Sequence, residues 1–354
     1  MEDIRITNLN VEKKTITSLQ SSGVITLKEV EHANLHKLHE DITQLQVDKI
    51  RTAFDDVKEI SDSYSKFLKN PVDIGKGRQR QTVQLVRDPG QEIEEGGEEY
   101  FLDEVFGLGE VIEIVGPSAC GKGQIGYQLC LNSQIPKELG GIEGEALYVD
   151  TNGDFCEERV LEMAKCFRMK LMKSLGKDDE LDVKLKEKYT EEKILERIYH
   201  FRIMDEDDQT SFFISLEKIL KSNKKIKCIY YDPINIHCSK AERGYQERKR
   251  IINNVLIHFL RLSKRFQVCF VLTNILKSVR KFYKESEPTT KLEPNYGEIL
   301  FQSCTNRVHI DRDSKIGDDI FKATLTKGSM FYERTKEFHM HFQVKESGIS
   351  GRIS

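Results

Sequence analysis

From residue 105 onward, short runs of apolar and β-branched residues alternate with stretches in which apolar positions recur about every third or fourth residue. The first pattern predicts buried β-strands, and the second predicts amphipathic helices. Alternation of the two is typical of an α/β domain whose sheet is mostly parallel, and the last strands are expected to be antiparallel at one end of that sheet. The predicted strands are 111–115, 146–149, 198–203, 226–231, 268–272, 307–310, 322–326 and 338–344.

The first part of the chain has a different pattern. Helical spacing of apolar residues up to position 64 predicts a small all-α domain, residues 1–64. Residues 65–99 are rich in Gly, Pro, Gln and charge, which indicates a linker with at most one short strand at 82–86. The α/β domain then occupies residues 100–354.

Composition narrows the class of protein. The net charge is only −3 over 354 residues, so contact with nucleic acid needs a local basic patch. No apolar stretch approaches the roughly 18 residues of a membrane span, and the polar start resembles neither a secretory signal nor a transit peptide. The eight cysteines form no C-x-x-C pair, which argues against a zinc ribbon and against a disulfide framework. We therefore expect a soluble intracellular protein with reduced thiols.

The strongest motif is GPSACGKG at residues 116–123, which fits the P-loop pattern G-x-x-x-x-G-K-[ST] except at Gly123. A predicted strand precedes it and a helical pattern follows it, as a P-loop requires. In such a loop, backbone N–H groups surround the nucleotide phosphates, the Lys reaches the β and γ oxygens, and the Ser/Thr hydroxyl ligates Mg²⁺. The phosphate cradle is kept here, and the metal-ligating hydroxyl is lost. The candidate ATP-binding residues of the loop are Gly116, Pro117, Ser118, Ala119, Cys120, Gly121, Lys122 and Gly123.

A second candidate follows the predicted strand 226–231. This apolar run ends in Asp232, and Walker B carboxylates are presented to Mg²⁺ in this way at the carboxyl edge of a sheet. The next strand, 268–272, is followed by the polar pair Thr273-Asn274. Asp232 is therefore the candidate metal ligand.

The order of these motifs resembles the RecA-like recombinases of the eukaryotic and archaeal RadA type, in particular their paralogues that do not form filaments. The resemblance covers about residues 100–350 and is carried by GEVIEIVGPSACGKGQIGYQLCLNSQIP, GGIEGEALYVDTNGDFCEERVLEMA, IKCIYYDP, FVLTN and PNYGEILFQSCTNRVHI. The phrases IYHFR and FQVKESGI are similar to the paralogues called B and C in vertebrates. The resemblance implies a RecA-like P-loop ATPase core that binds ATP and Mg²⁺.

Individual positions agree with the resembled family or depart from it. Arg159 matches an arginine that stacks on adenine in that family. Asn152 stands where the family has its water-activating Glu, and Ile275 stands where it has a Gln that senses the γ-phosphate. Loss of a positioned base costs about 10²–10⁴-fold in rate. We therefore assign no catalytic residue and expect ATP binding with weak or absent hydrolysis and weakly held Mg²⁺; the alternative is a pocket that no longer binds nucleotide.

Two predicted loops are the candidate DNA-binding segments. The resemblance implies that the segments after strands 226–231 and 268–272 touch single-stranded DNA. Basic residues interleaved with aromatic ones suit a groove that follows the DNA backbone and stacks bases, although a run of charge is also typical of a solvated surface. The candidates are Arg243 in the first loop and Lys277, Arg280, Lys281, Tyr283 and Lys284 in the second.

The resemblance implies a nuclear protein of homologous recombination and double-strand break repair. The leading hypothesis is a mediator that binds single-stranded DNA or the recombinase filament within a hetero-oligomer of recombinase paralogues. The linker lacks the Phe-x-x-Ala motif by which filament-forming members join, which argues against a self-assembling filament. Two rivals stay open: an active DNA-dependent ATPase whose missing groups come from a partner, and an interaction scaffold with neither activity.

Overall fold

The computed structural model describes residues 81–85, 101–174, 185–234, 244–283, 286–317, 319–328 and 338–352. The chain divides into two units, residues 1–78 and 79–354, and every described residue belongs to the second unit. The predicted amino-terminal helical domain and most of the predicted linker lie outside the described residues. Among the described helices, none is long and apolar enough to cross a membrane.

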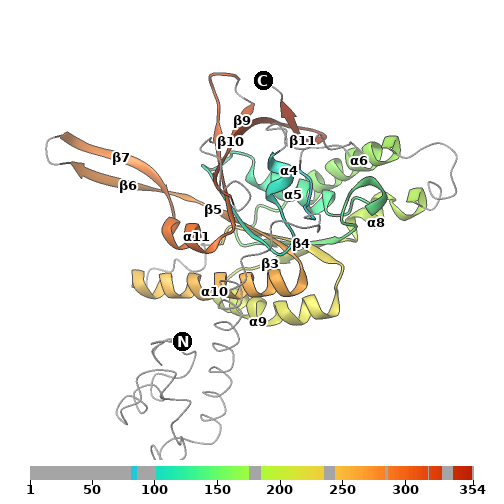
Figure 1. Cartoon of the computed structure of the whole chain (residues 1–354), viewed down its shortest axis with the longest axis horizontal. Coiled ribbons are helices and arrows are strands. Elements are labelled where there is room, and N and C mark those ends of the chain that lie inside the picture. Colours follow the sequence, from blue (N-terminus) through green and yellow to red (C-terminus); the bar gives the residue numbers. More distant parts are fainter. Residues whose placement is uncertain are drawn as a thin grey trace, which may run out of the picture. The chain divides into compact units, whose positions relative to one another are not determined.

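Nine strands of the described part form one sheet in the order β11-β10-β9-β8-β1-β5-β4-β2-β3 (Figure 1). The neighbours from β3 through β8 pair in parallel, and β9, β10 and β11 add antiparallel strands at one end. The predicted α/β architecture with an antiparallel end is confirmed. The bounds are β1 Val111–Val115, β2 Glu145–Asp150, β3 Ile198–Arg202, β4 Ile226–Asp232, β5 Cys269–Asn274, β8 Asn306–Arg312, β9 Ile320–Lys327, β10 Phe338–Lys345 and β11 Gly348–Arg352.

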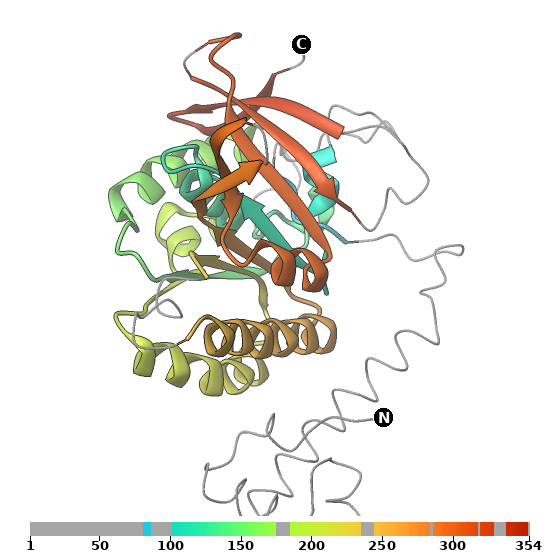
Figure 2. The same ribbon diagram turned by 90° about the vertical axis from the view of Figure 1, so that its left-hand side faces the viewer.

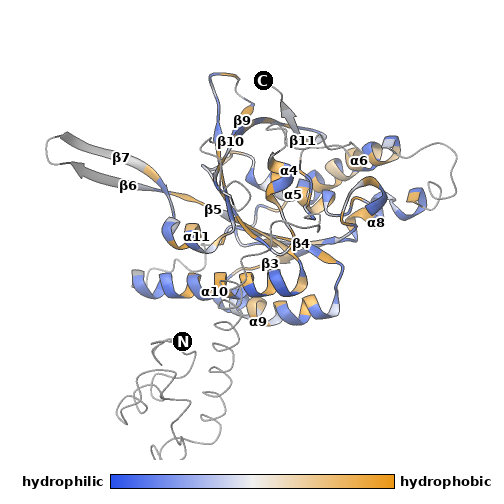
Figure 3. Ribbon diagram, in the orientation of Figure 1, coloured by the Kyte–Doolittle hydropathy of each residue, from blue (hydrophilic) through white to orange (hydrophobic). Residues whose placement is uncertain are grey.

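Helices cover both faces of the sheet (Figures 1 and 2). Because successive strand residues point to opposite faces, Tyr148 and Tyr230 join one buried cluster while Val149 and Tyr231 join the other. The helices turn their apolar sides toward these clusters (Figure 3). On the first face lie α4 Phe101–Val105, α5 Lys122–Asn132, the short 3₁₀ helix η4 Lys137–Leu139, α6 Glu157–Ser174 and α8 Glu191–Leu195; on the second lie α9 Glu206–Ser222, α10 Tyr245–Phe266 and α11 Gly297–Ser303.

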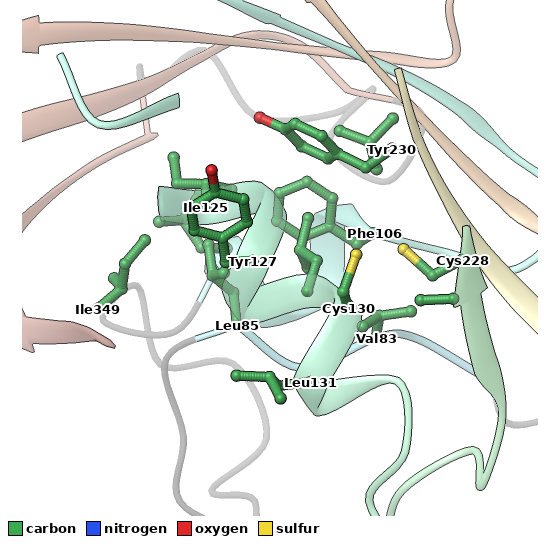
Figure 4. Packing of buried hydrophobic residues seen from close by; sticks show 14 of the residues in the cluster. Val83, Leu85, Phe106, Ile125, Tyr127, Cys130, Leu131, Cys228, Tyr230 and Ile349 are labelled. Carbon is green, nitrogen blue, oxygen red and sulfur yellow. The ribbon is translucent and has the colours of Figure 1, made fainter. Parts of the chain in front are cut away.

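Residues 83–85 are buried, although the sequence places them in a linker. Val83 and Leu85 are buried beside Phe106 (Figure 4), and the Val83 backbone N–H donates to the Phe106 carbonyl oxygen at 2.9 Å. The Leu85 N–H donates to the Asp103 carboxylate at 2.5 Å. The predicted short strand is only an isolated bridge between Thr82 and Gly107.

Two further segments differ from the sequence-based expectation. The charged composition of the segment from 176 to 193 predicts that it lies on the surface. Tyr189 in this segment is nevertheless fully buried, and its hydroxyl donates to the Gln134 carbonyl oxygen at 2.8 Å. The basic loop after β5 is a β-hairpin of β6 Leu276–Tyr283 and β7 Ser286–Pro294. The hairpin projects away from the main sheet (Figures 1 and 2).

Candidate nucleotide-binding site

The loop between β1 and α5 has the backbone of a phosphate cradle. Gly121 has φ 85° and Ala119 has φ 59°, so the chain turns through the left-handed region before α5 begins. A Cβ at Gly116 would lie 2.4 Å from the Ile310 carbonyl oxygen and 2.7 Å from the Cys120 Sγ, which restricts this position to glycine. The loop therefore reaches the start of the 11-residue helix α5, where unpaired N–H groups favour an anion.

Lys122 points back into the loop. Its Nζ donates to the carbonyl oxygens of Gly116 at 3.0 Å and Pro117 at 2.6 Å, and it lies 3.7 Å from the Cys120 Sγ. Burial raises the pKa of the Cys120 thiol, against the lowering effect of the Lys122 charge, so the thiol packs as a neutral group. The ammonium group thus lies where phosphate oxygens can replace carbonyl oxygens as its acceptors.

Asp232 ends β4 and is held by two hydroxyl groups. Its Oδ2 accepts a hydrogen bond from the Tyr148 hydroxyl at 3.0 Å, and its Oδ1 accepts one from the Thr273 hydroxyl. Burial raises the pKa of Asp232, and the bonds from Thr273 and Tyr148 lower it. A Cβ at Gly123 would lie 3.8 Å from Asp232 Oδ2, so the structure brings these two predicted site residues together.

At this position the protein lacks the hydroxyl with which a P-loop ligates Mg²⁺. Gly123 offers no side-chain oxygen, and both oxygens of Asp232 already accept hydrogen bonds. Within the described ranges, no cluster of three or more His, Cys, Asp or Glu side chains is arranged to hold a metal ion. Asp232 as a metal ligand stays a prediction, since each of its oxygens keeps a lone pair beside the hydrogen bond that it accepts.

The loop after β2 carries Asn152 at the position of the missing base. The buried Asp150 carboxylate accepts from the backbone N–H groups of Asn152 at 2.9 Å and Gly153 at 2.6 Å. The Tyr127 hydroxyl accepts from the Cys156 N–H at 2.9 Å. The Asn152 side chain is exposed, and its amide donates to the Asp154 carboxylate. The loop is fixed, and its exposed tip presents an amide rather than a proton acceptor.

Arg159 lies on α6 and connects three elements. Its Nε donates to the Gln124 Oε1 on α5 at 2.9 Å, and its two terminal nitrogens donate to the carbonyl oxygens of Lys345 at 2.6 Å and Glu346 at 3.0 Å. Gln124 follows Gly123 directly, so Arg159 lies beside the cradle. Adenine stacking by this guanidinium stays a prediction.

The candidate DNA-binding residues are only partly described. In the register of the hairpin, Lys277 lies opposite Glu293, Arg280 lies opposite Thr290, and Lys281 lies opposite Thr289. Tyr283 ends β6 opposite Ser286, while Arg243 and Lys284 lie outside the described residues. The structure thus gathers the described basic candidates of the second segment on one projecting hairpin.

A buried polar network beside the cradle was missed by the sequence analysis. Glu113, in the middle of β1, accepts from the Arg307 Nε at 2.5 Å and from the Asn274 amide at 2.7 Å. Asn274 also donates to the Asn295 carbonyl oxygen at 2.8 Å, and Arg307 donates to the Gly297 carbonyl oxygen at 2.6 Å. The network joins the strand that leads into the cradle to the base of the hairpin. An acidic residue inside an apolar strand was the available signal, because a buried charge needs a partner.

Comparison with known proteins places these features in a family. The Rad51 family model matches residues 96–351. The chain is 29% identical over 256 residues to the DNA repair protein RAD51 homolog 3 of Cricetulus griseus, a match that covers 70% of this chain and 66% of that protein. It is 31% identical over 219 residues to the DNA repair and recombination protein RadA of Aeropyrum pernix, which covers 60% of each. Both matches span less than two thirds of the relatives' own lengths. Together with the parallel sheet and the P-loop, the family match shows that this chain belongs to the Rad51 family.

Proposed function

We propose that this chain is a recombination mediator that binds ATP without hydrolysing it appreciably. In this proposal it acts in the nucleus, within a hetero-oligomer of recombinase paralogues, and binds single-stranded DNA or the recombinase filament during homologous recombination repair. The names of the two relatives refer to DNA repair and to recombination, which supports a role in this repair process.

One observation carries the proposal. The cradle keeps the backbone geometry and the lysine that phosphates need, at Gly116, Gly121 and Lys122. The groups that the resembled family uses for hydrolysis are replaced at Gly123 and Asn152. Because the phosphate-binding groups are kept and the groups for hydrolysis are replaced, we infer that the nucleotide acts as a structural or switching ligand.

Calorimetry tests the ATP site. The wild-type chain is expected to bind ATP, and Lys122→Ala is expected to weaken binding by about 1.5–3 kcal/mol, because a charge-assisted contact to phosphate is lost. The matched control is Lys218→Ala, which removes an exposed lysine from α9. Absence of ATP binding to well-folded wild-type protein would contradict the proposal and favour the alternative in which the chain is an interaction scaffold.

Fluorescence anisotropy with a mixed-sequence oligonucleotide tests the hairpin. Replacing Arg280, Lys281 and Lys284 with Ala is expected to weaken binding to all sequences and to reduce the salt dependence of the affinity, because each phosphate contact releases counterions. Tyr283→Ala is expected to cost about 1–3 kcal/mol if a base stacks on this ring.

The control for the hairpin variant removes three positive charges from outside the hairpin. Lys165, Lys173 and Lys218 are exposed on α6 and α9, and their replacement with Ala is expected to leave the salt slope unchanged. Equal affinity and equal salt slope in the hairpin triple variant and the wild type would remove the hairpin from the DNA-binding surface.

A further inference from the structure

The phosphate cradle of this chain lacks the hydroxyl that ligates a divalent cation in a P-loop. In P-loop proteins the residue after the lysine supplies a hydroxyl, and the Walker B carboxylate completes the hold on Mg²⁺. Gly123 has no side-chain oxygen, and Asp232 directs its two oxygens to the hydroxyls of Tyr148 and Thr273. Each of these oxygens already accepts one hydrogen bond, so Asp232 can offer a cation only the lone pair that remains on each oxygen.

The surroundings hold these hydroxyls in place. Tyr148 is 2% exposed, and its ring centroid lies 5.3 Å from those of Tyr127 and Tyr230. Both partner rings are visible in the packed cluster under the cradle (Figure 4). Thr273 is fully buried on β5. The Asp232 carboxylate is therefore part of a fixed polar wall of the cradle.

We propose that this cradle binds ATP without a divalent cation, with metal-free ATP bound at least as tightly as MgATP. The inference rests on the proposed function, since it presumes an ATP site. Magnesium already coordinates ATP in solution, so a protein gains affinity from the metal only through its own ligands. Where the loop hydroxyl is missing, the main effect of the metal is to reduce the negative charge that faces Lys122 and the start of α5, and this weakens the electrostatic attraction.

Calorimetry of the full chain with ATP, in Mg²⁺ and in EDTA at one ionic strength, tests this inference. The dissociation constant in EDTA is expected to equal that in Mg²⁺ within about twofold, or to be lower. Binding about tenfold or more weaker in EDTA overturns the inference and leaves the ATP site intact. Absence of binding in both buffers overturns the ATP site itself, so the two failures are distinguishable.

A pair of variants isolates the missing hydroxyl. A Cβ at position 123 meets its nearest neighbours, Asp232 Oδ2 and the Tyr148 hydroxyl, at 3.8 Å, which is ordinary van der Waals contact. Gly123→Thr is expected to make ATP bind about fivefold or more tightly with Mg²⁺ than without it, because it restores a ligand. Gly123→Val has the same shape without the hydroxyl and is expected to keep the wild-type ratio. Equal ratios in the two variants would show that this hydroxyl is not the missing ligand and overturn the inference.

Discussion

ATP turnover by the wild-type chain is expected to stay near background, with and without single-stranded DNA. The attacking water needs a proton acceptor, and the exposed Asn152 amide at that position donates to Asp154 instead. Loss of such a base costs about 10²–10⁴-fold, which corresponds to about 3–5 kcal/mol in the barrier. Steady-state phosphate release measures this, with Lys122→Ala as the reference for site-specific turnover.

A gain of activity is the sharper form of this prediction. Asn152→Glu combined with Gly123→Thr is expected to raise turnover, because it restores a base and a hydroxyl. The new carboxylate would lie close to Asp154, and a neighbouring like charge raises the pKa of an acid, which suits a general base at neutral pH. Asn152→Gln combined with Gly123→Thr is the matched control and is expected to stay at background. Wild-type turnover close to that of active Rad51-family ATPases, abolished by Lys122→Ala, would contradict the expectation.

Motifs and strands could be predicted because their signals are local. The P-loop, Asp232 and Asn152 are each recognised from a few adjacent residues, and every predicted strand from 111 onward overlaps an observed strand. The order of the strands in the sheet was not predicted, because alternation does not say which strands are neighbours. Local patterns thus suffice for the architecture and for locating candidate site residues at the ends of its strands.

Features that depend on contacts distant in sequence could not be predicted. A buried strand is predicted at 111–115, and all five residues are buried, but the sequence gives no sign of what neutralises the buried Glu113. Its partner Arg307 lies 194 residues later in the chain, and no local pattern connects the two. The burial of Tyr189 and of residues 83–85 could not be predicted for the same reason, because apolar side chains are few in these stretches and are buried by distant elements.

The buried pair of Glu113 and Arg307 gives the largest expected effect on stability. Arg307→Met is expected to destabilise the fold by about 3–5 kcal/mol, because it leaves the Glu113 carboxylate buried without its cation. Chemical denaturation monitored by circular dichroism measures this loss. Arg312→Met is the matched control, since Arg312 is an exposed residue of the same strand, and it is expected to change stability only slightly.

The pH dependence of Arg307→Met separates a buried charge from lost packing. Burial already raises the pKa of Glu113 above its ordinary value of 4.5, and the Arg307 charge and the hydrogen bonds from Asn274 and Arg307 lower it, so removing Arg307 raises it further. Above pH 4.5 the unfolded variant has released this proton while the folded variant retains it, so the folded state binds more protons and its stability falls as the pH rises toward the folded pKa. The deficit relative to the wild type is therefore expected to be larger near pH 8 than near pH 5. Adding Glu113→Gln removes the charge and is expected to recover much of the loss near pH 8. A deficit that is the same at both values of pH, and that Glu113→Gln does not reduce, would mean that Arg307 stabilises the fold through packing on Phe301 and its bond to Gly297 rather than through the ion pair.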